Sequence, residues 1–170
     1  MMNILVPLPT YGFDPTEVAI PWLLLNKAGF SVTFTTPNGD KASPDIRMLE
    51  GKDLGLLKST LQAREDAVIA CTEMQLTESF CNPISYDDVQ EQQFDALMLP
   101  GGHDKGVKEY LESKVLQGLV VEFFNQQKPV AAICHGVVLA ARSIDPISTK
   151  SVLFHYKTTS LLNSLGLLGY

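Results

Sequence analysis

The sequence predicts an α/β fold with a mostly parallel central sheet that is covered by helices on both faces. Three short segments are apolar almost throughout and end at a proline, a glycine or a cysteine: residues 3–9, 94–102 and 129–134. Amphipathic segments separate them. Apolar strands that alternate with amphipathic helices are typical of a buried parallel sheet. We predict that residues 1–170 form one domain, since this length suits a single sizeable core.

The first elements predict a β-α-β unit. Residues 3–9 are rich in strand formers and predict the first strand, and residues 10–15 predict a loop. Within that loop Asp14 can cap the next helix, which we expect at 16–29 and which ends on a glycine. Residues 31–40 predict a strand and a turn. The connection is long enough for a crossover between parallel strands.

The middle of the chain is less regular than its two ends. Residues 45–93 show no clear strand and predict a helical excursion, in which 82–89 form a short edge strand or an extended loop. The main sheet resumes after it. The remaining predicted elements are strands at 94–102, 129–134 and 151–156 and helices at 107–128, 136–143 and 158–168.

The composition argues against several classes of partner. Hydrophobic residues make up 45% of the chain and charged residues 19%, with a formal net charge of −6 and no long basic run. Nucleic acids and anionic membrane surfaces attract clustered Lys and Arg, so we expect neither as a partner. No apolar stretch is long enough to span a bilayer, and the N-terminus lacks the basic segment of a signal peptide. We predict a cytoplasmic protein.

Cysteine and histidine usage predicts neither a disulfide framework nor a metal centre. The three cysteines form no CxxC pair, and an odd, sparse set suits a reducing compartment. The three histidines show no metal-ligand spacing. We therefore expect no metal.

Three loops follow strands that end at one edge of the predicted sheet: 10–16, 101–106 and 134–136. Ligand sites in open α/β sheets form beyond the carboxyl ends of the strands. Cys134 stands where a strand turns directly into a helix, with small residues around it. This arrangement is typical of a nucleophile elbow, in which the helix N-terminus favours the thiolate.

A buried core position is the alternative for any free cysteine. We prefer the functional interpretation for Cys134 because of its strand-turn-helix context. Cys71 and Cys81 lie in the excursion with no polar partner nearby, and we expect both to be core residues.

The neighbouring turns supply further candidates for a site. The backbone N–H groups of His135 and Gly102 are candidate oxyanion donors, with Gly101 and His103 beside them. An ordinary strand-to-helix turn is the alternative for "PGGHD". The His135 imidazole either acts as a base or points away from the thiol. Glu17 lies in the first helical turn, where a carboxylate complements the helix dipole.

Three segments together resemble the ThiJ/PfpI superfamily, a branch of the class I glutamine-amidotransferase-like proteins. They are "DPTEVAIPWLLLNKAGFSVTFTTPNG", "FDALMLPGGHDKG" and "KPVAAICHGVVLAARS", and the resemblance covers nearly the whole chain with matching order and spacing.

The resemblance implies a flavodoxin-like three-layer sandwich and a homodimer that needs no cofactor. It implies that Cys134 is the nucleophile and that Glu17 shares a proton with it, which a partly desolvated carboxyl with a raised pKa could do. It also implies that His135 follows the nucleophile and that Gly102 and His135 supply the oxyanion hole.

The sequence departs from the family pattern in two places, which limits how far the roles of family residues can be assigned to this chain. A third, acidic member of a Cys-His-acid triad has no match, because glycine stands at 106 and asparagine at 163. The sequence also stops at "LLNSLGLLGY", where relatives of this type continue with another strand and helix. We expect a shortened relative or a fragment.

The leading hypothesis is a small-molecule enzyme that attacks an electrophilic substrate through Cys134. A glyoxalase-type reaction, which converts a 2-oxoaldehyde to a hydroxy acid, fits these residues, and so does a related hydrolysis. A redox-responsive or chaperone-like stress protein with an oxidisable Cys134 is the alternative. An intracellular peptidase is the weakest hypothesis because the triad acid has no match.

Overall fold

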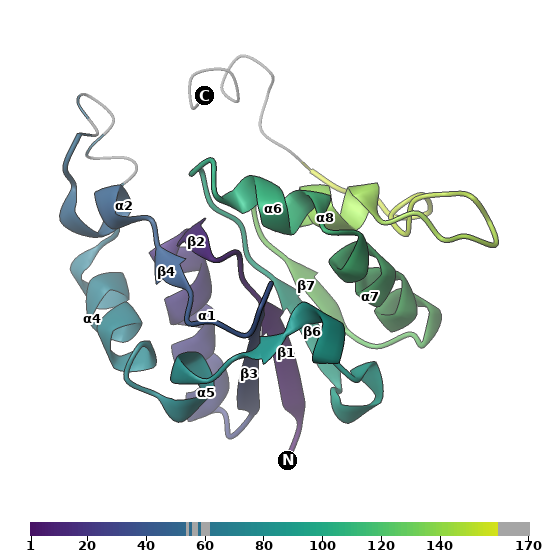
Figure 1. Cartoon of the computed structure of the whole chain (residues 1–170), viewed down its shortest axis with the longest axis horizontal. Helices are drawn as coiled ribbons and strands as arrows, with labels where there is room; N and C mark the ends of the chain where they lie inside the picture. Colours follow the sequence, from purple (N-terminus) through teal and green to yellow (C-terminus); the bar gives the residue numbers. More distant parts are fainter. Residues whose placement is uncertain (54, 56–57, 59–61, 160–170) are drawn as a thin grey trace.

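A five-stranded parallel sheet forms the centre of the protein (Figure 1). The computed structural model describes residues 1–53, 55, 58 and 62–159. The strand order is β5-β3-β1-β6-β7, and each neighbouring pair is parallel. The strands are β1 (Asn3–Pro7), β3 (Ser31–Thr36), β5 (Ile84–Ser85), β6 (Ala96–Leu99) and β7 (Val130–Ala132). The predicted α/β fold with a mostly parallel sheet is confirmed.

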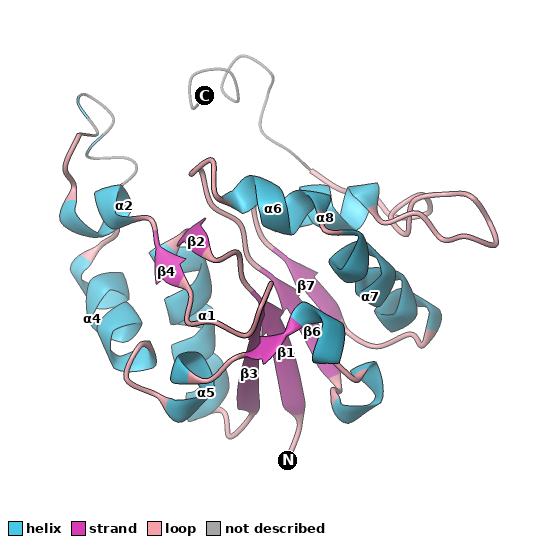
Figure 2. Cartoon of the chain, in the orientation of Figure 1, coloured by secondary structure: helices cyan, strands magenta, loops and turns pink. Residues whose placement is uncertain are grey.

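Helices cover both faces of this sheet, which gives the three layers of the predicted sandwich (Figure 2). One layer contains α1 (Pro15–Lys27), α4 (Glu65–Met74) and α5 (Glu78–Cys81). The other contains α6 (Val107–Glu112), α7 (Lys114–Asn125) and α8 (Gly136–Arg142).

Alternate side chains of β1 enter two separate cores. Ile4 and Val6 pack in the core that also holds Met74 of α4. Leu5 packs in the core that holds Phe123 of α7. All three β1 side chains are buried, so the strand has no polar face. This two-sided burial explains the continuous apolar pattern of the strand, because successive strand residues point to opposite faces.

The predicted excursion at 45–93 is largely helical. It contains α2 (Ile46–Glu50), α4, α5 and the short 3-10 helices η2 (Tyr86–Asp88) and η3 (Glu91–Gln93). The short edge strand predicted within 82–89 as one of two alternatives is confirmed as β5, which pairs with β3.

Two predicted boundaries were wrong. The loop predicted at 10–15 contains β2 (Tyr11–Phe13), which pairs in parallel with β4 (Ser43–Pro44) in a small second sheet. The helix predicted at 107–128 is two helices, α6 and α7. The second helix begins after Ser113, whose hydroxyl accepts a hydrogen bond from Leu116 N at 3.3 Å and caps α7.

The strand predicted at 151–156 was also wrong. Only an isolated antiparallel bridge joins Ile144 and Ser151, and turns follow. The N–H of Phe154 donates to Ser151 O, and that of Tyr156 donates to Leu153 O, each at 2.9 Å. These turn bonds satisfy the backbone locally, so the strand-forming side chains never enter the sheet. The helix predicted at 158–168 lies, apart from 158 and 159, outside the described residues.

No helix in the described part of the chain is both long enough and apolar enough to cross a membrane.

Gly136 shows how closely α8 approaches the sheet. A Cβ atom at this position would lie 2.0 Å from the carbonyl oxygen of Leu99 in β6. We expect Gly136→Ala to lower the free energy of unfolding by about 3 kcal/mol, the upper end for overpacking, because backbone atoms have to move. Urea unfolding measures this change.

Gly118→Ala is the matched control, since Gly118 lies in α7 with nothing within 4 Å of the methyl group that alanine would add. It should raise the free energy of unfolding by up to about 1 kcal/mol through helix propensity. Equal effects of the two alanines would contradict the close approach of α8 to β6.

Candidate active site

Cys134 occupies the sharp turn between β7 and α8. Its φ of 51° lies in the left-handed region, which is unusual for a residue with a side chain. Neighbouring hydrogen bonds hold the turn: Ile133 N donates to Leu99 O at 2.9 Å, and Gly136 N donates to Ile133 O at 2.8 Å. The residue is accessible to solvent, although its thiol is partly covered. The strand-turn-helix placement expected of Cys134 is therefore what the structure has.

The other two cysteines differ from each other. Cys71 is buried in α4, as predicted, whereas Cys81 is exposed at the end of α5. The prediction of a core position for Cys81 was wrong, because the end of this four-residue helix faces solvent. Its thiol donates to Gln75 O at 3.4 Å.

The side chain of Glu17 reaches from α1 to the Cys134 turn. Asp14 caps α1, with Oδ1 accepting from Thr16 N at 2.7 Å and from Glu17 N at 3.2 Å. Glu17 Oε2 accepts from Gly101 N at 2.8 Å, and its carboxyl group lies beside the Cys134 thiol and interacts with it. These contacts are specific, so Glu17 does more than complement a helix dipole.

Gly101 lies where the three loops meet. A Cβ atom there would lie 2.6 Å from His135 N, 3.0 Å from Glu17 Oε2 and 3.1 Å from Cys134 Cβ. Any side chain would push these groups apart. Because its N–H is donated to Glu17, Gly101 positions the carboxyl group and is not a donor to an oxyanion.

The carboxyl and the thiol both bind their protons more tightly than usual. Burial and the nearby charge of Asp14 raise the pKa of Glu17 to about 7. Burial and the charge of Glu17 raise the pKa of Cys134 to about 12. Together the pair holds two protons below about pH 7 and one proton above it.

This result corrects the expectation that the helix N-terminus alone lowers the pKa of the thiol. Burial and the adjacent carboxylate oppose ionisation of Cys134 more strongly than the short helix α8 favours it. Ionisation of the thiol therefore depends on transfer of its proton to Glu17.

The His135 imidazole lies beside the thiol and does not point away from it. Its Nδ1 is 3.5 Å from Cys134 Sγ. Burial and the neighbouring His103 lower the pKa of His135, while a hydrogen bond to the Gly102 backbone opposes this shift. The lowered pKa favours a neutral imidazole at neutral pH.

His103 and Gly102 complete this side of the site. The rings of His103 and His135 meet edge to face, with centroids 5.4 Å apart. Within the described chain, His103 Nδ1 is buried without a hydrogen-bond partner. The N–H of Gly102 likewise has no backbone acceptor among these residues, which leaves it available to a ligand.

The sequence spacing predicts no metal site, but the fold assembles a candidate. One side-chain ligand atom each from His103, Cys134 and His135 lie within 4.8 Å of one another. Sequence reasoning missed this cluster because His103 follows β6, whereas the other two residues follow β7.

A cavity of about 580 Å³ opens beside the two histidines. Its lining includes Gly102, His103 and His135 together with four basic residues, Arg47, Lys105, Lys108 and Arg142. This volume is enough for a small molecule next to the Cys134 turn.

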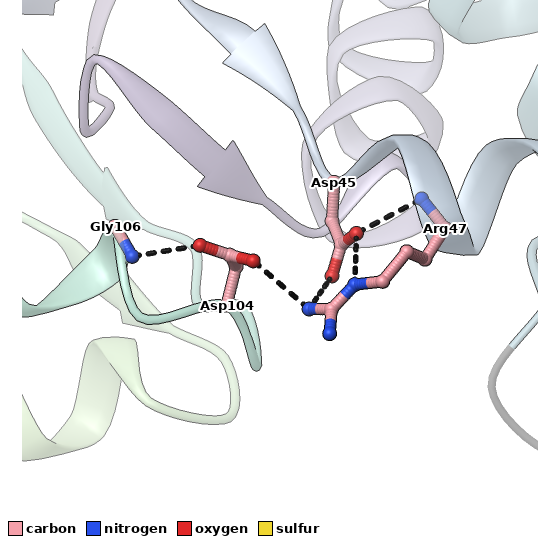
Figure 3. Close-up of polar contacts among 4 residues, drawn as sticks. All are labelled: Asp45, Arg47, Asp104 and Gly106. Atoms are coloured by element: carbon pink, nitrogen blue, oxygen red, sulfur yellow. Dashed lines mark hydrogen bonds and ion pairs between the residues drawn. The ribbon is translucent and has the colours of Figure 1, made fainter. Parts of the chain in front are cut away.

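Arg47 connects the excursion to the turn after β6 (Figure 3). Its guanidinium lies 2.8 Å from Asp45 Oδ2 and 2.9 Å from Asp104 Oδ2. Asp104 Oδ1 in turn accepts from Gly106 N at 2.8 Å. Sequence reasoning missed this contact because Arg47 and Asp104 lie 57 positions apart in the chain. Gly106, where an acid was sought, forms part of this turn.

The family of the chain follows from comparison with known sequences. The family model described as "ThiJ/PfpI family-like" matches residues 8–165. The chain belongs to this family. The resemblance inferred from the sequence is therefore confirmed.

One of the similar proteins is named as an enzyme. The glutathione-independent glyoxalase hsp3102 of Schizosaccharomyces pombe is 26% identical over 151 residues, covering 88% of this chain and 59% of that protein. Protein DJ-1 homolog D of Arabidopsis thaliana is 31% identical over 133 residues, covering 75% of this chain and 29% of that protein. The chain thus spans well under two thirds of the length of these relatives.

Solved structures support the fold. Glyoxalase III of Candida albicans superposes with a TM-score of 0.64 and 17% identity, covering 89% of this chain and 64% of that one. At this identity the similarity establishes the flavodoxin-like fold alone.

The protons of Glu17 and Cys134 can be followed by alkylation of the thiol. We expect the rate of Cys134 modification by iodoacetamide to rise through about pH 7, because the Glu17 carboxylate formed there can accept the thiol proton. Glu17→Gln should remove this inflection. Peptide mass spectrometry measures the rate, with the exposed Cys81 as an internal control. An unchanged inflection in Glu17→Gln would assign the titration to another group.

The Arg47 contacts should matter for stability. Asp45 is only 1% exposed, so Arg47→Met would leave a buried carboxylate without its cation. We expect the free energy of unfolding to fall by about 1.5–3 kcal/mol. Lys52→Met, which removes the exposed ion pair with Glu50, should cost at most about 1 kcal/mol. Equal losses of unfolding free energy in the two variants, measured by urea unfolding, would show that the Arg47 contacts stabilise the fold no more than an exposed ion pair does.

Proposed function

We propose that the protein is a cofactor-free, cysteine-dependent enzyme that converts a 2-oxoaldehyde to a 2-hydroxy acid. The observation that carries this proposal is the Glu17 carboxyl group, which lies beside Cys134, is fixed by Gly101 N–H and has a pKa raised to about 7. A base with a pKa near the working pH suits repeated proton transfer. The glyoxalase name of the Schizosaccharomyces pombe relative supports the same reaction class.

The first step is attack of sulfur on the aldehyde carbon. Glu17 accepts the thiol proton as the S–C bond forms, which gives a nucleophile despite the raised pKa of Cys134. The carbonyl oxygen gains the negative charge. The backbone N–H groups of Gly102 and His135 are the proposed donors to this oxyanion, which then takes a proton to give a hemithioacetal.

The next steps move one proton between neighbouring carbons and then release the product. A base removes the proton from the carbon that carries sulfur, and a proton returns to the adjacent carbon. The hydroxyl proton of the hemithioacetal is lost and the neighbouring oxygen gains one, which leaves a thioester of the 2-hydroxy acid. Glu17 and the neutral His135 are the two candidate bases. Water then cleaves the thioester, so that the hydroxy acid leaves and the thiol is restored. The overall change is addition of one water to the 2-oxoaldehyde, with no external oxidant or reductant.

A redox-responsive role is a second candidate, favoured by the exposure of Cys134. An accessible thiol can be oxidised in steps to sulfenic and sulfinic acids. A protonated Glu17 next to it could donate a hydrogen bond to a sulfinate oxygen. In that role Cys134 would oxidise under dilute peroxide, but no substrate would be turned over.

Formation of D-lactate from methylglyoxal without glutathione tests the leading proposal. We expect turnover by the wild-type protein and a loss of at least about 100-fold in Cys134→Ser, since the nucleophile is removed. Cys81→Ser is the matched control and should retain activity, because Cys81 is exposed at the distant end of α5. Equal turnover in wild type and Cys134→Ser, or none in either, would overturn the glyoxalase proposal for this chain.

A further inference from the structure

The cluster of His103, Cys134 and His135 has the composition of a zinc site. Thiolate sulfur and imidazole nitrogen are the ligands that Zn²⁺ prefers, and catalytic zinc sites commonly use three protein ligands with a fourth position open. One ligand atom from each of these residues lies within 4.8 Å of the other two. The Glu17 carboxyl contacts the thiol but does not belong to this cluster among the described residues.

The distance between two of the ligands already suits a tetrahedral ion. Zn–S and Zn–N bonds of about 2.3 Å and 2.0–2.1 Å at a tetrahedral angle place sulfur and nitrogen about 3.6 Å apart. Cys134 Sγ and His135 Nδ1 are 3.5 Å apart. The ligand atom of His103 lies within 4.8 Å of each of the other two ligand atoms.

His103 provides an independent observation that points to a ligand. Its Nδ1 is buried and has no hydrogen-bond partner in the described part of the chain. Buried polar atoms in native proteins are nearly always satisfied. An ion bound at the cluster would draw the His103 ring into coordination and relieve this deficit.

The surroundings also orient the two imidazoles. Metal-bound histidines usually donate their other ring N–H to a carbonyl or a carboxylate. The Gly102 backbone already interacts with the His135 ring. His103 lies on the turn that Asp104 joins to Arg47, so its backbone is held in place.

We propose that Cys134, His135 and His103 bind one Zn²⁺ ion, with a fourth position facing the adjacent cavity. The Zn–S bond forms as the thiol releases its proton to solvent, and no oxidation state changes. A metal-bound sulfur has less electron density for attack on carbon, so bound zinc blocks Cys134 reversibly. This proposal goes beyond the reaction proposed above and does not depend on it.

Direct binding measurements test the site without any activity assay. We expect the reduced protein to take up one equivalent of Zn²⁺ in competition with a chromophoric chelator. Co²⁺ should give the absorption of a tetrahedral site with a thiolate-to-cobalt charge-transfer band. Cys134→Ser should abolish that band, and His103→Gln should weaken zinc binding at least about tenfold.

Matched controls exclude binding elsewhere on the surface. Cys81→Ser and His155→Gln change an exposed cysteine and an exposed histidine outside the cluster, and both should bind Zn²⁺ like the wild type. Loss of binding in either control would place the metal elsewhere. Wild-type binding by His103→Gln would also overturn the three-ligand site. Thermal unfolding of each apo variant identifies any loss of binding that comes from misfolding, and His103→Asn serves as a second variant if His103→Gln misfolds.

Alkylation distinguishes this proposal from the proposed reaction. One equivalent of Zn²⁺ should slow iodoacetamide modification of Cys134 at least about tenfold, and a chelator should restore it. Modification of Cys81 should not change. This result holds whether or not methylglyoxal is a substrate, and an unprotected Cys134 at saturating zinc would contradict the site.

Discussion

The close approach of Gly101 to Glu17, Cys134 and His135 is the constraint on which the site depends. Three loops after three different strands converge there, and a single Cβ atom would separate them. Parallel strands bring their carboxyl ends to one edge of the sheet, so the fold supplies the proximity in coarse form. Because Gly101 has no side chain, Glu17 can approach its N–H to hydrogen-bond distance, close to Cys134 and His135. The left-handed backbone of Cys134 persists because these contacts hold it from both sides.

The same packing decides the electrostatics of the thiol. Bringing a carboxyl group close to sulfur in a partly buried place makes two negative charges unfavourable, so both protons are held more tightly. The titration of such a pair is better described by the number of protons that the pair holds than by a separate pKa for each group. Cys134 is thus reactive only when Glu17 takes its proton, and the reactivity of the elbow depends on α1 as much as on α8.

Local patterns predicted much of the fold and the centre of the site. Residues 3–9 and 94–102 are apolar because both sides of their strands are buried. The Cys134 turn follows from a strand and a helix with only residues 133–135 between them. No comparable pattern in the sequence marks the short pairing of β2 with β4 or the start of a new helix after Ser113. Residues 151–156 show the opposite error: strand-forming side chains are present, but the backbone is satisfied by turns.

Contacts between distant parts of the sequence escaped prediction for one physical reason. Arg47 and Asp104, or His103 and Cys134, meet only after the sheet has ordered its strands, so their spacing along the chain has no period to detect. Glu17 became more than a helix-dipole residue only through the resemblance of its segment to the family, because composition does not distinguish a carboxylate that faces water from one that faces a thiol.

The two chemistries proposed for Cys134 exclude each other at one sulfur atom. Attack on carbon needs the sulfur lone pair and a nearby group that keeps the proton for later return, which Glu17 can do. Metal binding needs the same lone pair but loses the proton to solvent, and it recruits the imidazoles of His135 and His103 instead. The thiol therefore lies between a proton acceptor on α1 and two metal ligands on the neighbouring turns. An ion bound on the histidine side would leave the carboxyl in place and remove only the nucleophile, which is the condition for reversible control of an otherwise intact site.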